Sequence, residues 1–336
     1  MVRSVALLCF LVLAAAPVEA ASHRNRGRRS SRPRSEAALD PARVNDPGTA
    51  PTIAMGARGD AVLRAQILLD RQHFSCGEID ATYGRNLRGA VIAFQTAQGQ
   101  TPTGVVDTET WSLLDRDDAP VLVTRSIAPE DVAGPFTPLP EDFSEKARLP
   151  ALGYASPLEA LAEKYHVSPS LLQRLNPGQA FDQAGAEILV PDVAAAPLTE
   201  RAAKIVVSEE HGCVEALDDT GHVIAHYPAS TGSHHDPLPL GSWKIVGVAH
   251  NPVFHYDPDL FWDATDRNKE VLPAGPNNPV GVCWIDLSKP HYGIHGTPEP
   301  SKVGRTQSHG CIRLTNWNVL ELAQIVRPGT PAILEK

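Results

Sequence analysis

The spacing of apolar residues changes once along the 336-residue chain, and this change constrains the fold more than any single motif. Up to about residue 175 the spacing is helical, as in "RGDAVLRAQILLDRQ", where Val62, Ala65 and Leu69 share one face. From Ala203 onward the apolar residues alternate with period two, and Asp-Asp-Thr-Gly at 218–221 reads as a hairpin turn. With 42% hydrophobic and 21% charged residues, the chain is predicted to be a multidomain globular protein, helical first and mainly β later.

The first fifty residues are predicted to lie outside the globular part. Residues 1–20 combine Arg3, an apolar run and small residues before Ala20, which is the pattern of a secretory signal peptide. We therefore expect a secreted protein of the periplasm or cell envelope that does not span a membrane. Residues 21–50 carry seven Arg, three acidic residues and almost no large apolar side chains, so they are predicted to be a disordered, Arg-rich tether.

The charge distribution limits the partners of the chain. Its net charge is −9 although the tether is basic, so the remainder is clearly acidic. A secreted and otherwise acidic protein is a poor partner for nucleic acid. The tether is expected either to be solvated or to be attracted to an anionic polymer of the envelope.

Residues 52–116 are predicted to form a bundle of three short helices. The second helix places Leu87, Val91 and Phe94 on one face, and Asp107 is the expected N-cap of the third. The string "IDATYGRNLRGAVIAFQTAQGQTPTGVVDTETWSLL" resembles the peptidoglycan-binding module that is often fused to cell-wall enzymes. The resemblance covers about 60 residues and implies binding only, because the segment carries no catalytic set.

Residues 117–149 are predicted to be a Pro-rich linker, followed at 150–193 by a helix, a second helix and a strand. This second segment resembles a LysM glycan-binding module through Ala162, Tyr165, Ser168, Leu172, Asn176, Gly185 and Pro191. The Gly-Asp-Thr-Leu entry typical of that family is missing at Ser156 to Leu158. The segment is therefore expected to be either an α/β glycan-binding module or a structural spacer.

Residues 202–336 contain a series of short strands and one substantial helix, "TNWNVLELAQIV", with Thr315 or Asn316 as its cap. We expect a mainly-β, sandwich-like domain. Near its end lies "SHGCIRL", where polar and basic neighbours make Cys311 a candidate nucleophile and not a core residue.

Acyl transfer by a cysteine needs a base close to the thiol and donors for the developing oxyanion. His295 in "YGIHGT" and His309, two residues before the thiol, are the candidate bases. Gly310 allows close approach of a substrate to the backbone, so its N–H and that of Cys311 are candidate oxyanion donors. Arg313 supplies a permanent cation for a substrate carboxylate and for lowering the thiol pKa.

The stretch "AGPNNPVGVCWIDLSKPHYGIHGTPEPSKVGRTQSHGCIRLTNWNVLELAQIVRPGTPAIL" resembles the YkuD-type L,D-transpeptidase catalytic domain. It contains that family's motif in order: His295-Gly296, a spacer, Ser-His-Gly-Cys at 308–311, and Arg313 two residues after the cysteine. The upstream stretch "STGSHHDPLPLGSWKI" also matches the family. The resemblance covers about 130 residues. It implies a peptidoglycan L,D-transpeptidase, in which a cysteine attacks a tetrapeptide stem at the L-centre of the diamino acid, releases D-Ala and transfers the acyl group to an amine.

The resemblance also implies roles for the site residues. Cys311 is expected to be the nucleophile and His295 the base, with the Gly296 carbonyl orienting its ring and His309 as the alternative base. The other members are expected to surround the reacting atoms: Ser308 and His309 beside the thiol, Gly310 among the oxyanion donors, and Arg313, Tyr292 and Trp284 toward the substrate.

No cofactor or metal is expected, because the histidines at 211, 222, 226, 234, 235, 250 and 255 lack any metal-ligand spacing and read as scattered exposed side chains.

The implied partners are peptidoglycan stem peptides and glycan, an envelope lipoprotein as a further acceptor, and carbapenem-type inhibitors. A role in cell wall biogenesis and cell shape follows. Three alternatives stay open: an L,D-carboxypeptidase that uses water, a non-catalytic wall-binding protein, and a zinc carboxypeptidase with the same N-terminal module.

Four cysteines remain after the signal peptide. Cys76 lies in the bundle, whereas Cys213 and Cys283 both lie in strand-like segments of the β domain. These two are expected either to form a disulfide in an oxidising compartment or to be buried free thiols.

Overall fold

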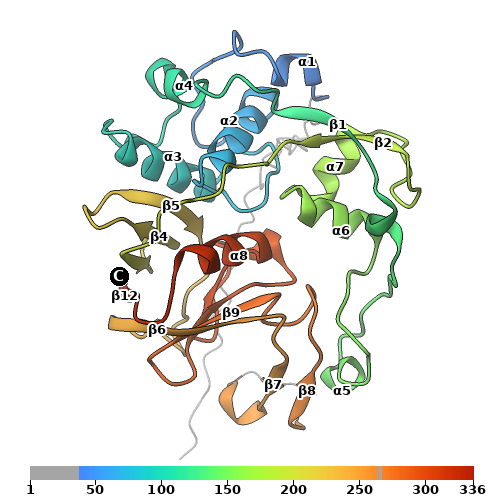
Figure 1. Ribbon diagram of the computed structural model, residues 1–336, viewed down its shortest axis with the longest axis vertical. Coiled ribbons are helices and arrows are strands. Elements are labelled where there is room, and N and C mark those ends of the chain that lie inside the picture. Colours follow the sequence, from blue (N-terminus) through green and yellow to red (C-terminus); the bar gives the residue numbers. More distant parts are fainter. Residues whose placement is uncertain (1–37, 263, 265–266) are drawn as a thin grey trace, which may run out of the picture. The chain divides into compact units, whose positions relative to one another are not determined.

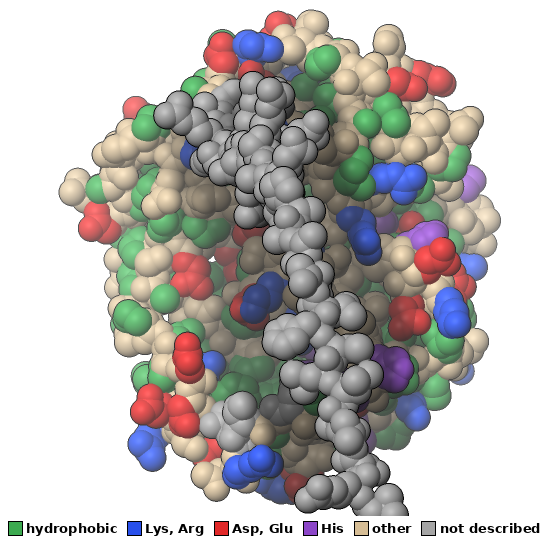
Figure 2. Space-filling model, turned by 180° about the vertical axis from the view of Figure 1, so that it is seen from behind, with side chains coloured by type: hydrophobic (Ala, Val, Ile, Leu, Met, Phe, Trp, Pro, Cys, Tyr) green, Lys and Arg blue, Asp and Glu red, His purple; other side chains and the backbone are tan. Residues whose placement is uncertain are grey.

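The structure is a computed structural model that describes residues 38–262, 264 and 267–336 (Figure 1). The predicted signal peptide and the part of the predicted tether up to residue 37 lie outside the described residues. Among the described helices, none combines the length and the apolar character that crossing a bilayer requires. On the face shown in Figure 2, acidic and basic side chains are interspersed over the described surface.

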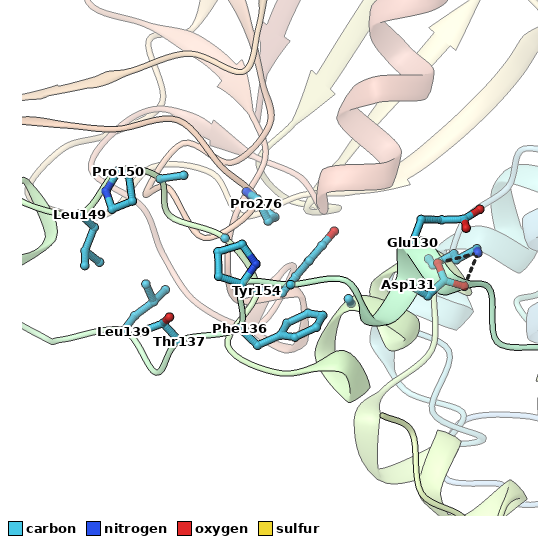
Figure 3. Close-up of a pocket in the computed structure, with 15 residues that line it drawn as sticks. Glu130, Asp131, Phe136, Thr137, Leu139, Leu149, Pro150, Tyr154 and Pro276 are labelled. Atoms are coloured by element: carbon cyan, nitrogen blue, oxygen red, sulfur yellow. Dashed lines mark hydrogen bonds and ion pairs between the residues drawn. The ribbon is translucent and has the colours of Figure 1, made fainter. Parts of the chain in front are cut away.

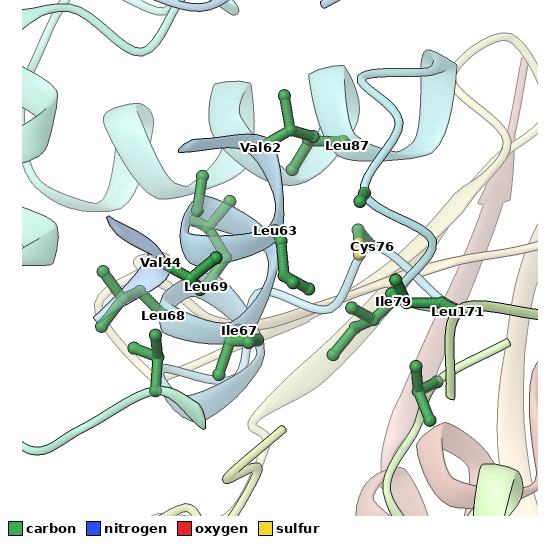
Figure 4. Packing of buried hydrophobic residues seen from close by; sticks show 14 of the residues in the cluster. Val44, Val62, Leu63, Ile67, Leu68, Leu69, Cys76, Ile79, Leu87 and Leu171 are labelled. Carbon is green, nitrogen blue, oxygen red and sulfur yellow. The ribbon is translucent and has the colours of Figure 1, made fainter. Parts of the chain in front are cut away.

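The predicted three-helix bundle consists of α2 (Asp60–Arg71), α3 (Arg85–Ala97) and α4 (Thr108–Leu114). The Asp107 side chain accepts a hydrogen bond from the Thr110 backbone N–H, so it caps α4 as predicted. Figure 4 shows the apolar face of α2 packed beside Leu87 of α3 and Ile79 of the connecting loop. The helical spacing of the sequence therefore identified the core of this region correctly.

Residues 38–50 differ from the predicted disordered tether. They contain a short helix, α1 (Pro41–Val44), and Val44 is fully buried against α2. The Arg64 guanidinium donates to the Val44 carbonyl, and the Asn45 side chain bonds to the backbone of Leu122. These partners lie far away in the sequence, so composition could not show that the end of the basic segment is ordered.

The predicted linker contributes a strand. β1 (Leu122–Ser126) pairs antiparallel with β2 (Glu187–Pro191), and between them lie the helices α5 (Phe143–Lys146), α6 (Pro157–Lys164) and α7 (Pro169–Leu175). The two helices and the strand predicted for residues 150–193 are thus present as α6, α7 and β2. Ile79 of the bundle, Leu171 and Val190 belong to one buried cluster, so the bundle and this segment share a core.

The second half of the chain is mainly β with one main helix, as predicted. Eight strands form one mixed sheet in the order β11, β10, β9, β6, β12, β3, β4, β5, and a short pair, β7 (Phe254–Tyr256) and β8 (Glu270–Leu272), stands apart. The eight strands are β3 (Lys204–Ser208), β4 (Cys213–Leu217), β5 (Val223–Pro228), β6 (Gly241–His250), β9 (Cys283–Leu287), β10 (Gly293–His295), β11 (Ile312–Arg313) and β12 (Pro331–Glu335).

The helix α8 (Asn316–Ile325) covers one face of this sheet, with Thr315 as its N-cap. Val319 and Leu322 of α8 lie in one buried cluster with Ile285 of β9. The strand β12 lies between β3, with which it runs parallel, and β6, with which it runs antiparallel. The strand nearest the C-terminus therefore occupies an interior position of the sheet.

The helical half contacts the β half through hydrogen bonds at several points. His73 Nδ1 lies 2.5 Å from Oε1 of Glu321 on α8, and Asn86 donates to the Val303 carbonyl at 2.9 Å. The Ser75 backbone N–H donates to the carbonyl of His226 on β5. The loop around residue 75 thus contacts the edge strand of the sheet.

The four cysteines of the described chain are all free thiols. Cys213 on β4 and Cys283 on β9 are separated by β3, β12 and β6 in the sheet, which places them roughly 19 Å apart at about 4.8 Å per strand. A disulfide needs Cα atoms within about 7 Å, so of the two expected alternatives Cys213 and Cys283 are buried free thiols.

We accordingly expect mass mapping of the non-reduced, denatured protein to find Cys76, Cys213, Cys283 and Cys311 all alkylated. The protein should be alkylated with and without reductant to the same extent. A peptide pair linking residues 213 and 283 would contradict the strand order of the sheet.

Candidate active site

The candidate residues come together on one face of the short strands β9, β10 and β11. His295 lies opposite Arg313 in the parallel β10–β11 pair and opposite Trp284 in the antiparallel β10–β9 pair. Paired residues share a face of a sheet, and so do residues two apart along a strand. Cys311 lies in the bend directly before β11, and the Arg313 charge acts on both its thiol and the His295 ring.

His295 is buried and held by the backbone. Its Nδ1 lies 2.7 Å from the Gly296 carbonyl oxygen. Because a carbonyl only accepts, Nδ1 carries the proton and Nε2 is left as an acceptor. Burial, together with the Arg313 charge, lowers the pKa of His295 to about 3, against the opposing effect of the Gly296 hydrogen bond. The ring is therefore neutral near pH 7, in the form that can take a proton.

Trp284 fixes the other side of the His295 ring. The two rings are stacked, with centroids 5.4 Å apart and planes inclined by 14°. A Cβ added at Gly293 would lie 2.4 Å from the Trp284 indole, so the indole covers this glycine. From the sequence we expected Trp284 to face the substrate. In the structure its indole stacks on the ring of His295, the candidate base.

The Cys311 thiol is partly exposed. Burial of the sulfur raises its pKa above the usual value, while the Gly293 backbone N–H and the Arg313 charge partly lower it. Little thiolate is therefore present at neutral pH, and the thiol needs a base to become nucleophilic.

The turn before Cys311 is closed by Ser308. Its backbone N–H donates to the Thr231 carbonyl, and its hydroxyl donates to the Cys311 carbonyl. Gly310 has φ +92°, and a Cβ there would lie 2.8 Å from the Tyr292 ring, so only glycine fits. Among the described residues, the backbone N–H groups of Gly310 and Cys311 have no acceptor, which leaves both available to an oxyanion.

Arg313 carries an unpartnered donor. Its Nε is buried and has no hydrogen-bond partner within the described part of the chain. Burial lowers the pKa of Arg313 while Glu299 opposes this shift, and the guanidinium stays charged at any physiological pH. A buried, unpaired cationic donor costs free energy, so this geometry suits a site that a substrate carboxylate completes.

Replacing Arg313 with Lys is expected to keep the charge but lose the planar donor geometry. We expect a loss of about 1–3 kcal/mol in binding, or tenfold or more in kcat/KM. Steady-state kinetics with a stem-peptide donor measures this, with an unchanged melting temperature as the control for folding. Kinetics equal to those of the unmodified protein would show that the guanidinium has a structural role only.

His309, the alternative base, has different surroundings. Its ring meets Phe261 edge-on with centroids 5.0 Å apart and lies 6.1 Å from the Trp262 ring. His295, in contrast, has the backbone hydrogen bond that fixes a tautomer. The geometry favours His295 as the base and His309 as a residue that shapes the wall beside the thiol.

Asn316 is a member of the site that the sequence indicated only as a possible helix cap. Its Oδ1 accepts a hydrogen bond from the Val282 backbone N–H at 3.2 Å. A Cβ built on Gly281 or on Gly296 would lie 2.1 Å from this oxygen. The Asn316 side chain is therefore seated against the peptide whose carbonyl holds His295. Only the long-range fold could show this.

One of the histidines that were predicted to be scattered, exposed side chains is buried instead. His226 is buried and lies 3.4 Å from the Glu215 carboxylate, and Cys213 completes a group of three potential metal-ligand atoms within 4.8 Å of one another. The carboxylate pairing accounts for this histidine without a metal. The remaining six are exposed: His211, His222, His234, His235, His250 and His255.

Outside this cluster, the described residues line a smaller and a larger cavity. One of about 260 Å³ is lined by Ser230, Thr231 and Gly232 of the Ser-Thr-Gly segment, together with Arg85 and Arg305. The other, of about 460 Å³, is lined by residues of the segment between β1 and α6, among them Phe136 and Tyr154, and by Pro276 (Figure 3).

Comparison with known proteins identifies the relationship. Residues 202–334 match the family model described as "L,D-transpeptidase catalytic domain" (YkuD), and residues 58–114 match the model described as "Putative peptidoglycan binding domain". The "Putative L,D-transpeptidase YkuD" of Bacillus licheniformis is 33% identical over 175 residues, which cover 52% of this chain and 90% of that protein. The protein of the same name from Bacillus subtilis is 29% identical over 180 residues, covering 53% of this chain and 93% of the relative.

A solved structure of an L,D-transpeptidase (residues 123–326) from Xylanimonas cellulosilytica aligns with 85% of this chain and 98% of its own, at 16% identity and a TM-score of 0.35. The sequence matches to the two Bacillus proteins are the stronger result, because they extend over nearly the whole length of those proteins. This chain belongs to the YkuD-type L,D-transpeptidase family, with an additional peptidoglycan-binding domain of its own.

Proposed function

We propose that the protein is a peptidoglycan L,D-transpeptidase with Cys311 as the nucleophile. The observation that carries the proposal is the neutral, Gly296-bound His295, which pairs with Arg313 on the neighbouring strand, where the Arg313 charge acts on both His295 and Cys311. The His295 tautomer fixed by Gly296 leaves Nε2 as an acceptor for the thiol proton, and two unoccupied backbone N–H groups suit the oxyanion.

The reaction proceeds in two half-reactions. His295 Nε2 takes the thiol proton as Cys311 attacks the carbonyl between the L-centre of the diamino acid and the terminal D-Ala of a tetrapeptide stem. The tetrahedral intermediate collapses to a thioester, and the proton passes from His295 to the leaving amine of D-Ala. An amine of a second stem then attacks the thioester, which forms a 3→3 cross-link and restores the thiol.

The accessory parts would bring the enzyme to its substrate. The domain at residues 58–114 would bind the wall polymer, and the α6–α7–β2 segment would bind glycan or act as a spacer. With residues 1–20 as a signal peptide, the protein would act in the periplasm or cell envelope, in wall biogenesis and the maintenance of cell shape. An envelope lipoprotein is a further acceptor, and a carbapenem would acylate Cys311.

The test is incubation of the purified protein with a disaccharide-tetrapeptide, followed by mass spectrometry. Release of D-Ala with formation of a 3→3 dimer supports the proposal. D-Ala release with tripeptide alone would make the protein an L,D-carboxypeptidase. No release at all would leave a wall-binding protein without turnover, and release that a chelator abolishes would indicate zinc chemistry.

A further inference from the structure

One continuous set of contacts joins the α6 segment to the candidate base. Asn316 Nδ2 lies 3.1 Å from both carboxylate oxygens of Glu163, near the end of α6, and it also donates to the Pro276 carbonyl at 3.1 Å. On the other side of the same amide, Oδ1 is seated against Gly281 and Gly296. The Gly296 carbonyl in turn accepts from His295 Nδ1.

The carboxylate determines which way the Asn316 amide points. An ionised carboxylate only accepts hydrogen bonds, and a protonated one keeps its carbonyl oxygen as an acceptor, so in both forms Glu163 can hold the NH₂ group of Asn316 toward α6 and leave Oδ1 facing the two glycines. Tyr154 donates its hydroxyl to Glu163 Oε1 at 2.8 Å and thereby limits the carboxylate to this orientation. The inverted amide would place an NH₂ group against the Val282 N–H and lose that hydrogen bond.

This arrangement is maintained at a cost in stability. Burial raises the pKa of Glu163 from its usual value to about 7, although its hydrogen bonds with Tyr154 and Asn316 lower it. A carboxyl whose pKa is higher in the folded chain than in the unfolded chain lowers stability as pH rises between those two values. A neutral side chain at position 163 would avoid this cost, so stability alone does not account for the carboxylate.

We propose that Glu163 is a positioning residue of the active site, which fixes the Gly296 peptide, and thereby the His295 ring, through Asn316. The segment before the catalytic domain would then be part of the catalytic apparatus and not only a spacer. This inference rests on the proposed function, because it assigns Glu163 to the base of that reaction. Tyr154 and Pro276, which contact the two ends of the Glu163–Asn316 pair, also line the cavity of about 460 Å³ (Figure 3).

The test measures acylation of the full chain by a carbapenem and separates the maximal rate constant from the half-saturating concentration. Glu163→Ala should lower the maximal rate constant about 10- to 100-fold, as expected for a misplaced base, and leave the half-saturating concentration nearly unchanged. Glu163→Gln should lose less, because its side-chain carbonyl can still accept from Asn316. The deficit of Glu163→Ala should shrink at high pH, where the thiol ionises without help from His295.

The matched control is Glu321→Gln. Glu321 also joins the helical half to α8, through His73, but it does not contact the Gly296 peptide. This variant should acylate at the rate of the unmodified protein. An equal loss in Glu321→Gln would show that any weakened contact between the helical half and α8 slows acylation, which would overturn the assignment.

A double variant gives the decisive result. In a His295→Ala background, Glu163→Ala should cost nothing further, because the group that it positions is gone. An undiminished additional loss, or unchanged acylation in Glu163→Ala alone, would refute the inference. If Glu163→Ala fails to fold, Asn316→Asp, which sets two carboxyl groups against each other, should show the same deficit and the same lack of additivity. Failure of the unmodified protein to acylate at Cys311 would instead overturn the proposed function.

Discussion

Cys311→Ala is expected to abolish both stem-peptide turnover and the covalent adduct with a carbapenem. A carbapenem presents a strained acyl carbon, so attack by the thiol should leave a stable thioester and a mass increase on the intact protein. Removal of a nucleophile commonly costs about 10⁶-fold in rate, which takes the reaction below detection. Intact-protein mass spectrometry after incubation with the carbapenem measures the adduct directly.

The other thiols supply the control for this experiment. Cys76, Cys213 and Cys283 are buried, and burial raises the pKa of each of them. Cys283→Ala should therefore retain full adduct formation, provided that it folds. A carbapenem adduct on the Cys311→Ala protein would place the nucleophile elsewhere and would contradict the proposed mechanism.

His295→Ala is expected to slow acylation by about 10²- to 10⁴-fold, the usual contribution of a general base. The rate should recover partly at high pH, where the Cys311 thiol ionises unaided. Because the pKa of His295 is lowered to about 3, the ring of the unmodified protein stays neutral above that pH. The pH–rate profile should therefore show no inflection from this histidine near its usual pKa of 6.5.

His309→Ala separates the two histidines. Its ring packs against Phe261 and Trp262, so its loss should alter the wall beside the thiol and cost less than the loss of His295. Its deficit should also persist at high pH. If His309→Ala is instead the variant that alkali rescues, while His295→Ala acylates normally, the two roles must be exchanged.

The sequence was informative where the signal was local. The period of apolar residues predicted α2 to α4 and the β half, and Asp107 predicted the start of α4. The order His-Gly, Ser-His-Gly-Cys and Arg identified His295 and Arg313, which the fold then pairs on neighbouring strands. In each case, neighbours along the chain carry the information.

The sequence was uninformative where a residue acts through a distant partner. Val44 looked like part of a basic tail, yet α2 buries it. Leu122 stands in a Pro-rich stretch, yet it begins a strand that pairs with Pro191. Glu163 has the spacing of an ordinary exposed position of a short helix, and only the contact with Asn316, 153 positions later, distinguishes it.

The interior position of β12 makes assembly of the site depend on a strand that is synthesised after all the candidate site residues. Ala332 pairs with Ile205 on one side and with Trp243 on the other, so β12 joins β3–β5 to the strands that carry His295 and Arg313. Until residues 331–335 join the sheet, β3 and β6 lack the partner strand that lies between them. The helical half, whose contacts are mostly closer in sequence, can fold earlier. We therefore expect the thiol to acquire its reactive surroundings only after β12 has been synthesised and has paired with β3 and β6.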